Sequence, residues 1–520
     1  MHLRNLCEPI KVGGLELRNR IVMPAVETGF YGPARGPDRI REFYAERAKG
    51  GAGLIICKPP SPFVEGRRPG VTIRRDTLVA ELRALTDAIH SHGGRIAAQL
   101  SARIMWSRRE GEQAKLVGPS DVSAPRGGRP MPPPRPLSVE EIEQIIAEKS
   151  AEARIALEAG FDMLEIHAHG GRSLASHFIS PLTNRRTDGY GGSRENRYRF
   201  LFEQLRGARE QAGQDFPIAC RISGADFLDG GCTLEDTKMA APMLENAGFC
   251  AIDVTTGWHE ASVAFFQTSV RPGSFVYLAE EVKKVVSGPV IGGPRVSDPV
   301  FADRLIAEGR IDLVYMARAL FADPELPNKV REGRLDEIRP CFACNHCFEV
   351  SQGFTKPISC SVNFQMGREG ECTVCLAPNP KKVVVVGGGP AGMEAARVAA
   401  LRGHRVTVIE RQDRLGGNLN VAVIPPFKDD ISRVIRYFEW QLELLGVEVK
   451  LGEEATPESI VGSNADVVIL ATGALPIVPG IPGVKGANVA TAEGVLTGKE
   501  QTGEKVVVIG GGMIGCEVAE

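Results

Sequence analysis

The sequence lacks a long apolar run, a leader-like N-terminus and an excess of charge of either sign. No stretch reaches the ~18 uninterrupted apolar residues of a membrane-spanning helix, and the opening "MHLRNLCEPIKVGGLELRN" has no apolar h-region. The 62 basic and 64 acidic residues give a formal net charge of −2, which offers nucleic acid or a membrane surface no overall attraction. We therefore expect a cytoplasmic protein with a small-molecule substrate, and leave the formation of a homo-oligomer open.

Short apolar runs with helix-length spacers fill the first 335 of the 520 residues. The helical spacer after residue 137 shows the pattern well, because Ser138 and Glu141 make a capping box and Gly160 can close the helix. Eight such runs favour a parallel (β/α)8 barrel over a doubly wound sheet, the other α/β fold considered. The runs are "RIVMP" at 20, "GLIIC" at 53, "RIAAQL" at 95, "DMLEIH" at 162, "PIACRIS" at 217, "AIDVTT" at 251, "PVIGG" at 289 and "DLVYMAR" at 312.

The ends of these runs are unusually polar, and chemistry in such a barrel sits at the C-terminal ends of its strands. Gln99 and Arg221 could hydrogen-bond a flat heterocycle, while Gly293 and Arg318 could hold a phosphate. A ring with a phosphate tail suggests flavin mononucleotide (FMN), although an ordinary polar rim is the simpler alternative. The strand ends in chain order are Pro24, Cys57, Gln99, His167, Arg221, Gly257-Trp258-His259, Gly292-Gly293 and Arg318.

Several stretches, among them "AGFDMLEIHAHGG", "HFISPLTNRRTDGYGGSRENRYRF" and "GWHEA", resemble the Old Yellow Enzyme family. The similarity is to the branch that contains 2,4-dienoyl-CoA reductase, 2-enoate reductase and trimethylamine dehydrogenase. It implies FMN at the barrel mouth, with Gly293, Ala317 and Arg318 at the phosphate. The residues implied around the flavin ring are Pro24, Ala25, Cys57, Gln99 and Arg221.

A run of cysteines follows the barrel in "CFACNHC" and "FEVSQGFTKPISC". The spacing C-x2-C-x2-C-x12-C of Cys341, Cys344, Cys347 and Cys360 favours a [4Fe–4S] cluster, because structural zinc more often takes two separated C-x2-C pairs. Zinc stays open on spacing alone, and the family resemblance also implies a [4Fe–4S] cluster directly after the barrel.

A dinucleotide fingerprint begins near residue 383. An apolar run leads into Gly387, Gly389 and Gly392, and a second run ends at Glu410, which can accept hydrogen bonds from a ribose. Together with Gly473 in "VVILATGALP", this resembles flavoprotein disulfide-reductase folds and implies FAD, or ADP in the trimethylamine dehydrogenase branch.

A second fingerprint, Gly510, Gly512 and Gly515, follows the apolar run Val506 to Ile509, which predicts a strand. We expect it to open an NAD(P)H-binding domain that the sequence interrupts, and we expect an incomplete FAD site. The predicted organisation is an FMN barrel over 1–335, a [4Fe–4S] segment over 336–380, an FAD domain over 381–500 and the start of an NAD(P) domain over 501–520.

The resemblance implies a relay in which NAD(P)H reduces FAD and electrons cross the cluster to FMN, which reduces an activated alkene. His259 in "GWHEA" is the candidate acid or oxyanion donor, with loop filling as its alternative. His167 is in place in "HAHGGRS", but His169 is displaced by one position and the family's tyrosine proton donor is missing.

The substrate stays open between an enoate and an enoyl-CoA thioester. Arginines after the second and third strands could meet CoA phosphates or a carboxylate, or form a solvated surface. Trp258 could sit over a quaternary amine, which would favour an amine dehydrogenase, and the missing tyrosine leaves a non-catalytic electron carrier open. The arginines are Arg67, Arg68, Arg74, Arg75, Arg103, Arg108 and Arg109.

Overall fold

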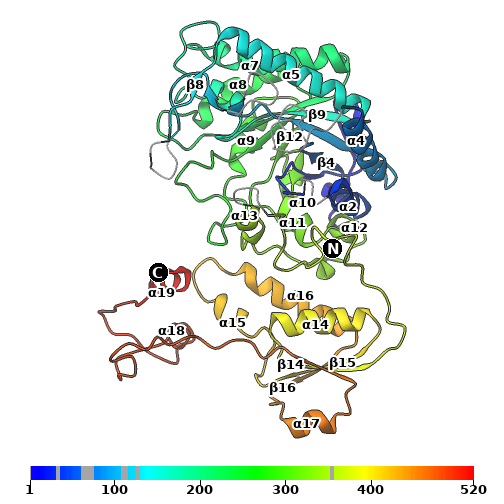
Figure 1. Cartoon of the computed structure of the whole chain (residues 1–520), viewed down its shortest axis with the longest axis vertical. Helices are drawn as coiled ribbons and strands as arrows, with labels where there is room; N and C mark the ends of the chain where they lie inside the picture. Colours follow the sequence, from blue (N-terminus) through cyan, green and yellow to red (C-terminus); the bar gives the residue numbers. More distant parts are fainter. Residues whose placement is uncertain are drawn as a thin grey trace. The chain divides into compact units, whose positions relative to one another are not determined.

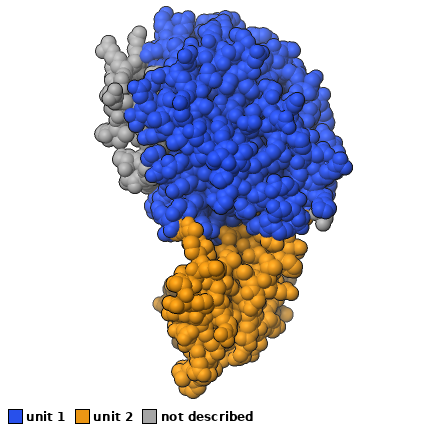
Figure 2. Space-filling model, turned by 90° about the vertical axis from the view of Figure 1, so that its right-hand side faces the viewer, with its two compact units in different colours: residues 1–334, 345–371 blue, residues 335–344, 372–520 orange. Residues whose placement is uncertain are grey.

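The computed structural model describes residues 2–30, 36–59, 75–106, 115–124, 129, 131–351 and 356–520. The chain divides into two compact units, Met1–Arg334 with Asn345–Glu371, and Leu335–Cys344 with Cys372–Glu520 (Figure 2). The segment 336–380, predicted from the sequence as a separate cluster-binding part, is thus shared between the two units. Within the described residues, no helix is long and apolar enough to cross a membrane.

Eight parallel strands of the first unit close into a barrel, which confirms the predicted fold. Seven of the strands fall inside one of the eight apolar runs, the fourth extends one residue past its run to Ala168, and neighbouring strands in the barrel follow chain order. They are β3 (Ile21–Met23), β4 (Leu54–Cys57), β5 (Ile96–Leu100), β9 (Met163–Ala168), β10 (Ile218–Ser223), β11 (Ile252–Thr255), β12 (Val290–Gly292) and β13 (Leu313–Tyr315).

Helices cover the outside of these strands (Figure 1). The helix α5 begins with the predicted capping box, in which the Ser138 hydroxyl accepts from the Glu141 N–H and the Glu141 carboxylate accepts from the Ser138 N–H. Helix α8 begins with the same arrangement at Thr233 and Asp236. The helices of this layer are α2 (Gly36–Lys49), α4 (Arg75–His90), α5 (Val139–Glu158), α7 (Arg194–Ala212), α8 (Leu234–Ala247), α9 (Tyr277–Lys283) and α10 (Pro299–Ala307).

A hairpin formed by β1 (Ile10–Val12) and β2 (Leu15–Leu17) closes the barrel at the N-terminal ends of its strands. Val12 and Leu17 of its two strands are fully buried in one apolar cluster with inward residues of the barrel strands. The turn needs Gly13, whose φ is +54° and whose Cβ would lie 2.6 Å from Cys250 Cβ. Shorter elements complete the unit: α1 (Arg4–Cys7), β6 (Met105–Trp106), β7 (Lys115–Gly118), β8 (Arg135–Pro136), α6 (Leu174–Ile179), α11 (Ala317–Ala322), α12 (Leu326–Arg331) and α13 (His346–Ser351).

The second unit contains a parallel sheet in the order β16-β15-β14-β17. In chain order this is 3-2-1-4, the arrangement of a mononucleotide-binding half of a dinucleotide fold. Its elements are η1 (Leu335–Glu337), β14 (Lys382–Val386), α14 (Pro390–Leu401), β15 (Arg405–Glu410), α15 (Leu419–Ala422), α16 (Asp430–Leu444), β16 (Glu448–Leu451), α17 (Pro457–Gly462), β17 (Val467–Leu470), α18 (Ala492–Leu496) and α19 (Met513–Ala519).

The strand predicted at Val506 to Ile509 is wrong. These four residues have no strand structure and are exposed, Val507 to 88%. A strand forms when a neighbour takes up its backbone N–H and C=O groups, and no described segment pairs with this run.

Candidate active site

The inward side chains of the barrel form layers, because alternate residues of a strand point to the same face. The lowest layer is apolar and includes Ala97, Met163, Ala219, Ala251 and Leu313. Two residues further along the same strands, the inward face becomes polar. This second layer consists of Gln99 on β5, Glu165 on β9, Arg221 on β10, Asp253 on β11 and Tyr315 on β13.

The polar layer is held together by hydrogen bonds and charge. Gln99 Nε2 donates to Glu165 Oε1 over 2.7 Å. Arg221 Nε lies 3.6 Å from Asp253 Oδ2, and the Arg221 guanidinium carbon is 5.5 Å from the centre of the Tyr315 ring. Among the described residues, Arg221 Nη1 is buried without a hydrogen-bond partner. A ring that presents carbonyl oxygens and an N–H can satisfy this guanidinium and the Gln99 oxygen, so the layer fits the edge of a flavin.

Sequence reasoning missed the two acids of this layer. Glu165 lies inside the apolar run "DMLEIH" and Asp253 inside "AIDVTT". The signal was an ionisable residue at an inward position of a barrel strand, since such side chains are almost never fully buried without a partner.

Three histidines form a row above the polar layer. The His169 ring centre lies 6.0 Å from that of His167 and 6.1 Å from that of His259. Ser101 Oγ is 3.1 Å from His167 Nδ1, and Ser223 Oγ is 3.0 Å from His169 Nδ1. The structure thus brings together three side chains predicted from the sequence, including the displaced His169.

The electrostatic setting keeps two of these imidazoles neutral. Burial, with nearby cations, holds the pKa of His167 and the pKa of His169 well below their usual range. At neutral pH both rings therefore carry one N–H donor and one acceptor nitrogen.

The loop that carries His259 is anchored by its neighbour Trp258. The Trp258 side chain is fully buried, and its ring centre lies 4.8 Å from that of His177. The His177 Nε2 atom lies 2.8 Å from the backbone oxygen of Gly171, in the loop after β9. Trp258 is therefore part of the packing, and its buried ring is not free to lie over a quaternary amine, the role considered for it from the sequence.

An acid forms ion pairs with two cations where the first three barrel strands end. Glu27 follows β3, Lys58 follows β4 and Arg103 follows β5. Glu27 Oε2 is 2.9 Å from Lys58 Nζ, and Glu27 Oε1 is 2.9 Å from Arg103 Nη2. Burial by itself would raise the pKa of Glu27, but the two cations outweigh it and lower the pKa to about 2. Burial lowers the pKa of Lys58 to about 8, against the opposing effect of Glu27.

The arginine set predicted after the second and third strands is divided. Arg67, Arg68, Arg74, Arg108 and Arg109 lie outside the described residues. Arg103 belongs to the Glu27 cluster, and Arg75 pairs with Glu158 over 2.6 Å at an exposed position. The structure therefore places one of these arginines near the histidine row.

Other residues predicted around the flavin follow the strand ends. Pro24 and Ala25 come directly after β3. Cys57 is fully buried and follows Ile56, whose side chain belongs to the inward apolar cluster of the barrel, so the alternation of side chains along a strand turns the Cys57 thiol toward the helix layer. Any contact of Cys57 with a ring in the barrel mouth would come from its backbone.

The residues predicted at the phosphate lie at the ends of β12 and β13. Gly293 has φ +127°, and a Cβ there would lie 2.8 Å from Val314 Cγ2, so this position requires glycine. Ala317 begins α11, and the next residue, Arg318, donates through Nη1 to Phe266 O and to Asn345 Oδ1, each over 2.7 Å.

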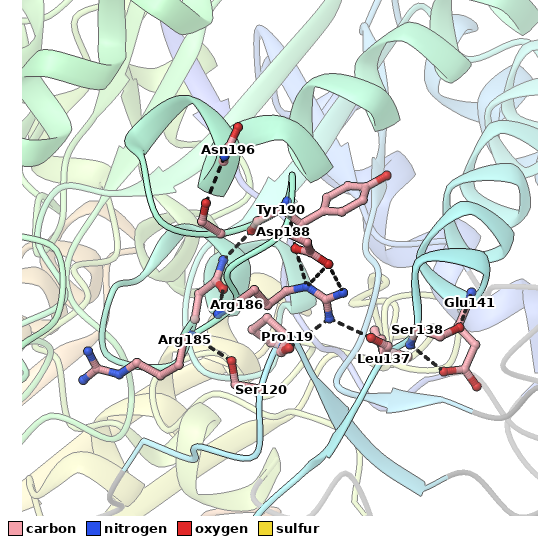
Figure 3. A network of polar contacts seen from close by, with 12 residues as sticks. Pro119, Ser120, Leu137, Ser138, Glu141, Arg185, Arg186, Asp188, Tyr190 and Asn196 are labelled. Carbon is pink, nitrogen blue, oxygen red and sulfur yellow. Dashed lines mark hydrogen bonds and ion pairs between the residues drawn. The ribbon is translucent and has the colours of Figure 1, made fainter.

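The family-like stretch after α6 forms a polar network rather than a catalytic group (Figure 3). Arg186 Nη1 donates to Leu137 O over 2.6 Å and to Pro119 O over 3.1 Å, while its Nε donates to Asp188. The Arg185 N–H donates to Ser120 Oγ over 2.7 Å, and its side chain points away from the network (Figure 3). This network joins the segment before α7 to the residues directly after β7 and directly after β8.

The four predicted cluster ligands are half-buried. Cys341 and Cys344 precede α13, Cys347 lies in α13, and Cys360 follows it. Within the described residues, no three His, Cys, Asp or Glu side chains converge on a point that a single metal ion could occupy. Each thiolate of a [4Fe–4S] cluster binds a separate iron atom, so four cluster ligands do not have to converge on one point. The assignment of these four cysteines as cluster ligands stays a prediction.

The first dinucleotide fingerprint has the predicted local geometry. Gly387 has φ +106°, and a Cβ on Gly392 would overlap the Gly387 oxygen, so both positions require glycine. Gly389 is the N-cap of α14. Glu410 Oε2 accepts from the Gly388 N–H over 2.6 Å, so this acid also holds the glycine turn.

The second fingerprint repeats part of this geometry. Gly510 has φ +112°, Gly512 is the N-cap of α19, and a Cβ on Gly515 would overlap the Gly510 oxygen. Gly473 has φ +80° with open space around it. The turn and helix of a nucleotide site are therefore present at Gly510, without the strand that was predicted before them.

Profiles of known families match consecutive parts of the chain. The NADH:flavin oxidoreductase / NADH oxidase family matches residues 5–337. The FAD dependent oxidoreductase family matches residues 382–444, and the pyridine nucleotide-disulphide oxidoreductase family matches residues 448–520. These matches agree with the predicted order of an FMN, an FAD and a pyridine-nucleotide part.

Individual relatives cover nearly the whole chain. A metal reductase of Desulforamulus reducens is 40% identical over 526 residues, 99% of this chain and 77% of that protein. A cinnamate reductase of Clostridium sporogenes is 38% identical over 550 residues, 99% of this chain and 80% of that protein. The solved structure of a 2-naphthoyl-CoA reductase with 2-naphthoyl-CoA has a TM-score of 0.91 and 36% identity, over 99% of this chain and 81% of that chain.

Proposed function

This chain belongs to the NADH:flavin oxidoreductase / NADH oxidase family, and we propose that it reduces the activated C=C bond of an enoate or enoyl-CoA thioester. The observation that carries the proposal is the row of His167, His169 and His259 above the Gln99 and Arg221 layer. The likeness to a cinnamate reductase and to a structure with a bound aryl-CoA supports this substrate class.

The proposed cofactor sites use the residues predicted from the sequence. Gln99 and Arg221 would hold the FMN ring, and Gly293 with Arg318 its phosphate. Bound FMN would supply the hydride that reduces the alkene. Cys341, Cys344, Cys347 and Cys360 would hold a [4Fe–4S] cluster, Gly387, Gly389, Gly392 and Glu410 the FAD, and Gly510, Gly512 and Gly515 the NAD(P)H.

The histidine row would polarise the substrate. With Nδ1 of His167 and His169 at serine hydroxyls, the Nε2 atoms are left to face a carbonyl oxygen. A hydrogen bond to that oxygen draws electron density from the conjugated double bond and stabilises the charge that develops there. Because both rings are neutral, they can donate without adding a cation to the site.

His259 is the proposed proton donor to the α-carbon. It lies at the end of the row, on a loop that the fully buried Trp258 holds in place. General acid catalysis contributes roughly 10²- to 10⁴-fold to a rate, so loss of His259 should slow substrate reduction by at least about a hundredfold.

Reoxidation of the reduced flavin tests the proposal. The protein is reduced anaerobically with dithionite and mixed with cinnamate-type enoates and with enoyl-CoA thioesters. The proposal predicts that one of these classes reoxidises the flavin and that His259→Gln slows this step, with unchanged reduction by dithionite. His92→Gln, at an exposed position, is the matched control.

Two results would contradict the proposal. In one, artificial acceptors reoxidise the flavin but neither alkene class does. In the other, oxidised protein is bleached by N-methylated amines, which would assign the chain to amine oxidation instead.

A further inference from the structure

Two acids in the barrel, Glu165 and Asp253, have no part in the chemistry proposed above. Both belong to the layer that contains Gln99 and Arg221, and neither has any exposed surface. An ionised carboxylate in such a place is costly unless it is paired and hydrogen-bonded. Their presence therefore calls for a way to satisfy two buried carboxyl groups.

The charges around the pair do not balance if both acids are ionised. Arg221 is the cation that acts on them in the described part of the barrel, so two carboxylates would leave one negative charge uncompensated. Tyr315, Cys220 and Gln99 also lie nearby, and none of them brings a positive charge.

The hydrogen bonds show the same deficit. Glu165 Oε2 and both oxygens of Asp253 are buried without a donor among the described residues. Within the part of the chain that the structure describes, one of these acids' four oxygens, Glu165 Oε1, receives an N–H, from Gln99. A proton placed between the two carboxyls would turn an unsatisfied contact into a hydrogen bond and remove the excess charge.

We propose that Glu165 and Asp253 are positioning residues of the flavin site, which share one proton and thereby orient Gln99 and Arg221. The proton resides on Glu165, whose Oε2 then donates to Asp253, while Asp253 stays ionised and balances Arg221. Gln99 is fixed with Nε2 toward Glu165 and its oxygen available to a ring N–H. Arg221 keeps Nη1 for the ring's acceptors.

The titration behaviour of the pair supports this assignment. Burial, followed by the charge of Asp253, raises the pKa of Glu165 to about 8, although Arg221 and Gln99 oppose it. Burial also raises the pKa of Asp253, but Arg221, and a hydrogen bond from Glu165 once it carries the proton, act in the opposite direction. The shared proton should therefore be present at neutral pH and be lost as the pH rises through about 8.

The inference rests on the proposed flavin site, but its first test does not require flavin. Infrared spectra of the flavin-free full chain at about pH 7 should show the carbonyl stretch of a buried protonated carboxylic acid. This band should fade as the pH rises through about 8, and it should be absent from Glu165→Gln. Glu152→Gln, which removes a buried acid paired with Lys149 in α5, should leave the band unchanged.

The second test measures how tightly the protein binds reduced FMN relative to oxidised FMN, through the midpoint potential of the bound flavin. Glu165→Gln keeps an acceptor for Gln99 and a donor for Asp253, so we expect the affinity ratio at neutral pH to stay within about twofold of wild type. Adding Asp253→Asn to Glu165→Gln leaves the charge of Arg221 unbalanced, because Glu165 can then no longer ionise in place of Asp253, and this favours the reduced ring. We expect about a tenfold rise in the ratio, equivalent to a potential higher by about 30 mV.

The outcomes separate this inference from the proposed function. Absence of the infrared band in wild type, or its persistence in Glu165→Gln, would overturn the shared proton whatever the flavin does. A rise of about 30 mV in Glu165→Gln alone would show that Glu165 is ionised in wild type and would also overturn it. Failure of the barrel to bind FMN, with the band present, would refute the proposed function and leave the shared proton standing.

Discussion

Removing the charge of Glu369 should destabilise the first unit strongly, because this acid balances a buried arginine. Arg47 on α2 is fully buried, and its Nη1 atom lies 2.5 Å from Glu369 Oε1, with Glu369 only 8% exposed. The same nitrogen donates to Phe43 O over 2.7 Å, and the guanidinium carbon is 3.7 Å from the centre of the Phe43 ring. The change Glu369→Gln keeps the shape of the side chain but leaves the Arg47 charge without a counter-charge.

The expected size of the effect follows from burial. Breaking one partner of a buried ion pair costs about 3–5 kcal/mol, because the remaining charge stays desolvated. For a unit of this size, each kcal/mol lowers the melting temperature by roughly 1.3 °C. We therefore expect Glu369→Gln to lower the apparent Tm by roughly 4 to 7 °C in thermal scans at one fixed rate.

Two comparisons make this prediction sharp. Glu308→Gln removes an acid from an exposed pair with Arg310 and should shift the Tm by less than about 1 °C. The double change Arg47→Met with Glu369→Met removes both charges and should destabilise less than Glu369→Gln alone. The reasoning would be refuted if Glu369→Gln had the same Tm as the Glu308→Gln control. It would also be refuted if the double variant lowered the Tm by as much as the two single changes added together.

Two further predictions concern the nucleotide fold and the barrel mouth. Gly392→Ala should weaken FAD binding by the second unit relative to the unchanged chain, because the new methyl group would overlap the Gly387 oxygen. Gly462→Ala meets open space and should bind FAD as the unchanged chain does. FAD titration of the three proteins checks this. Glu27, with its pKa lowered to about 2, contributes stability above about pH 4.5 that is lost as the pH falls toward 2. Glu27→Gln lacks this contribution, so it should be less stable than wild type by roughly 1–3 kcal/mol near neutrality, allowing for partial exposure, with a gap that closes in acid. A constant gap in unfolding experiments from neutral to acid pH would disprove the assignment.

Part of the candidate site was predictable because each barrel strand is a short apolar run that ends in polar residues. The eight apolar runs predicted the strands, and the polar residues at their ends marked the catalytic mouth, since parallel strands of a barrel all end on the same side. Glycine positions in the dinucleotide fold were equally clear, because only glycine allows the turn at Gly387 and the close contact at Gly392.

Other features depend on which side chains meet across strands far apart in the chain. The carboxyls of Glu165 and Asp253 interact although β10 lies between their strands, and only the closed barrel brings them to one layer with Gln99 and Arg221. The same holds for Trp258, which is adjacent in sequence to the candidate proton donor yet is buried against His177.

The amino-acid sequence by itself determined the order of the parts, the eight strands and the local turns, because apolar periodicity, caps and glycines act over a few residues. Tertiary structure alone decided which acids are buried together, which residues the cations balance, and that Val506 to Ile509 forms no strand. These features depend on partners distant in the chain, and a residue's charge state or pairing is set by the neighbours that folding brings to it.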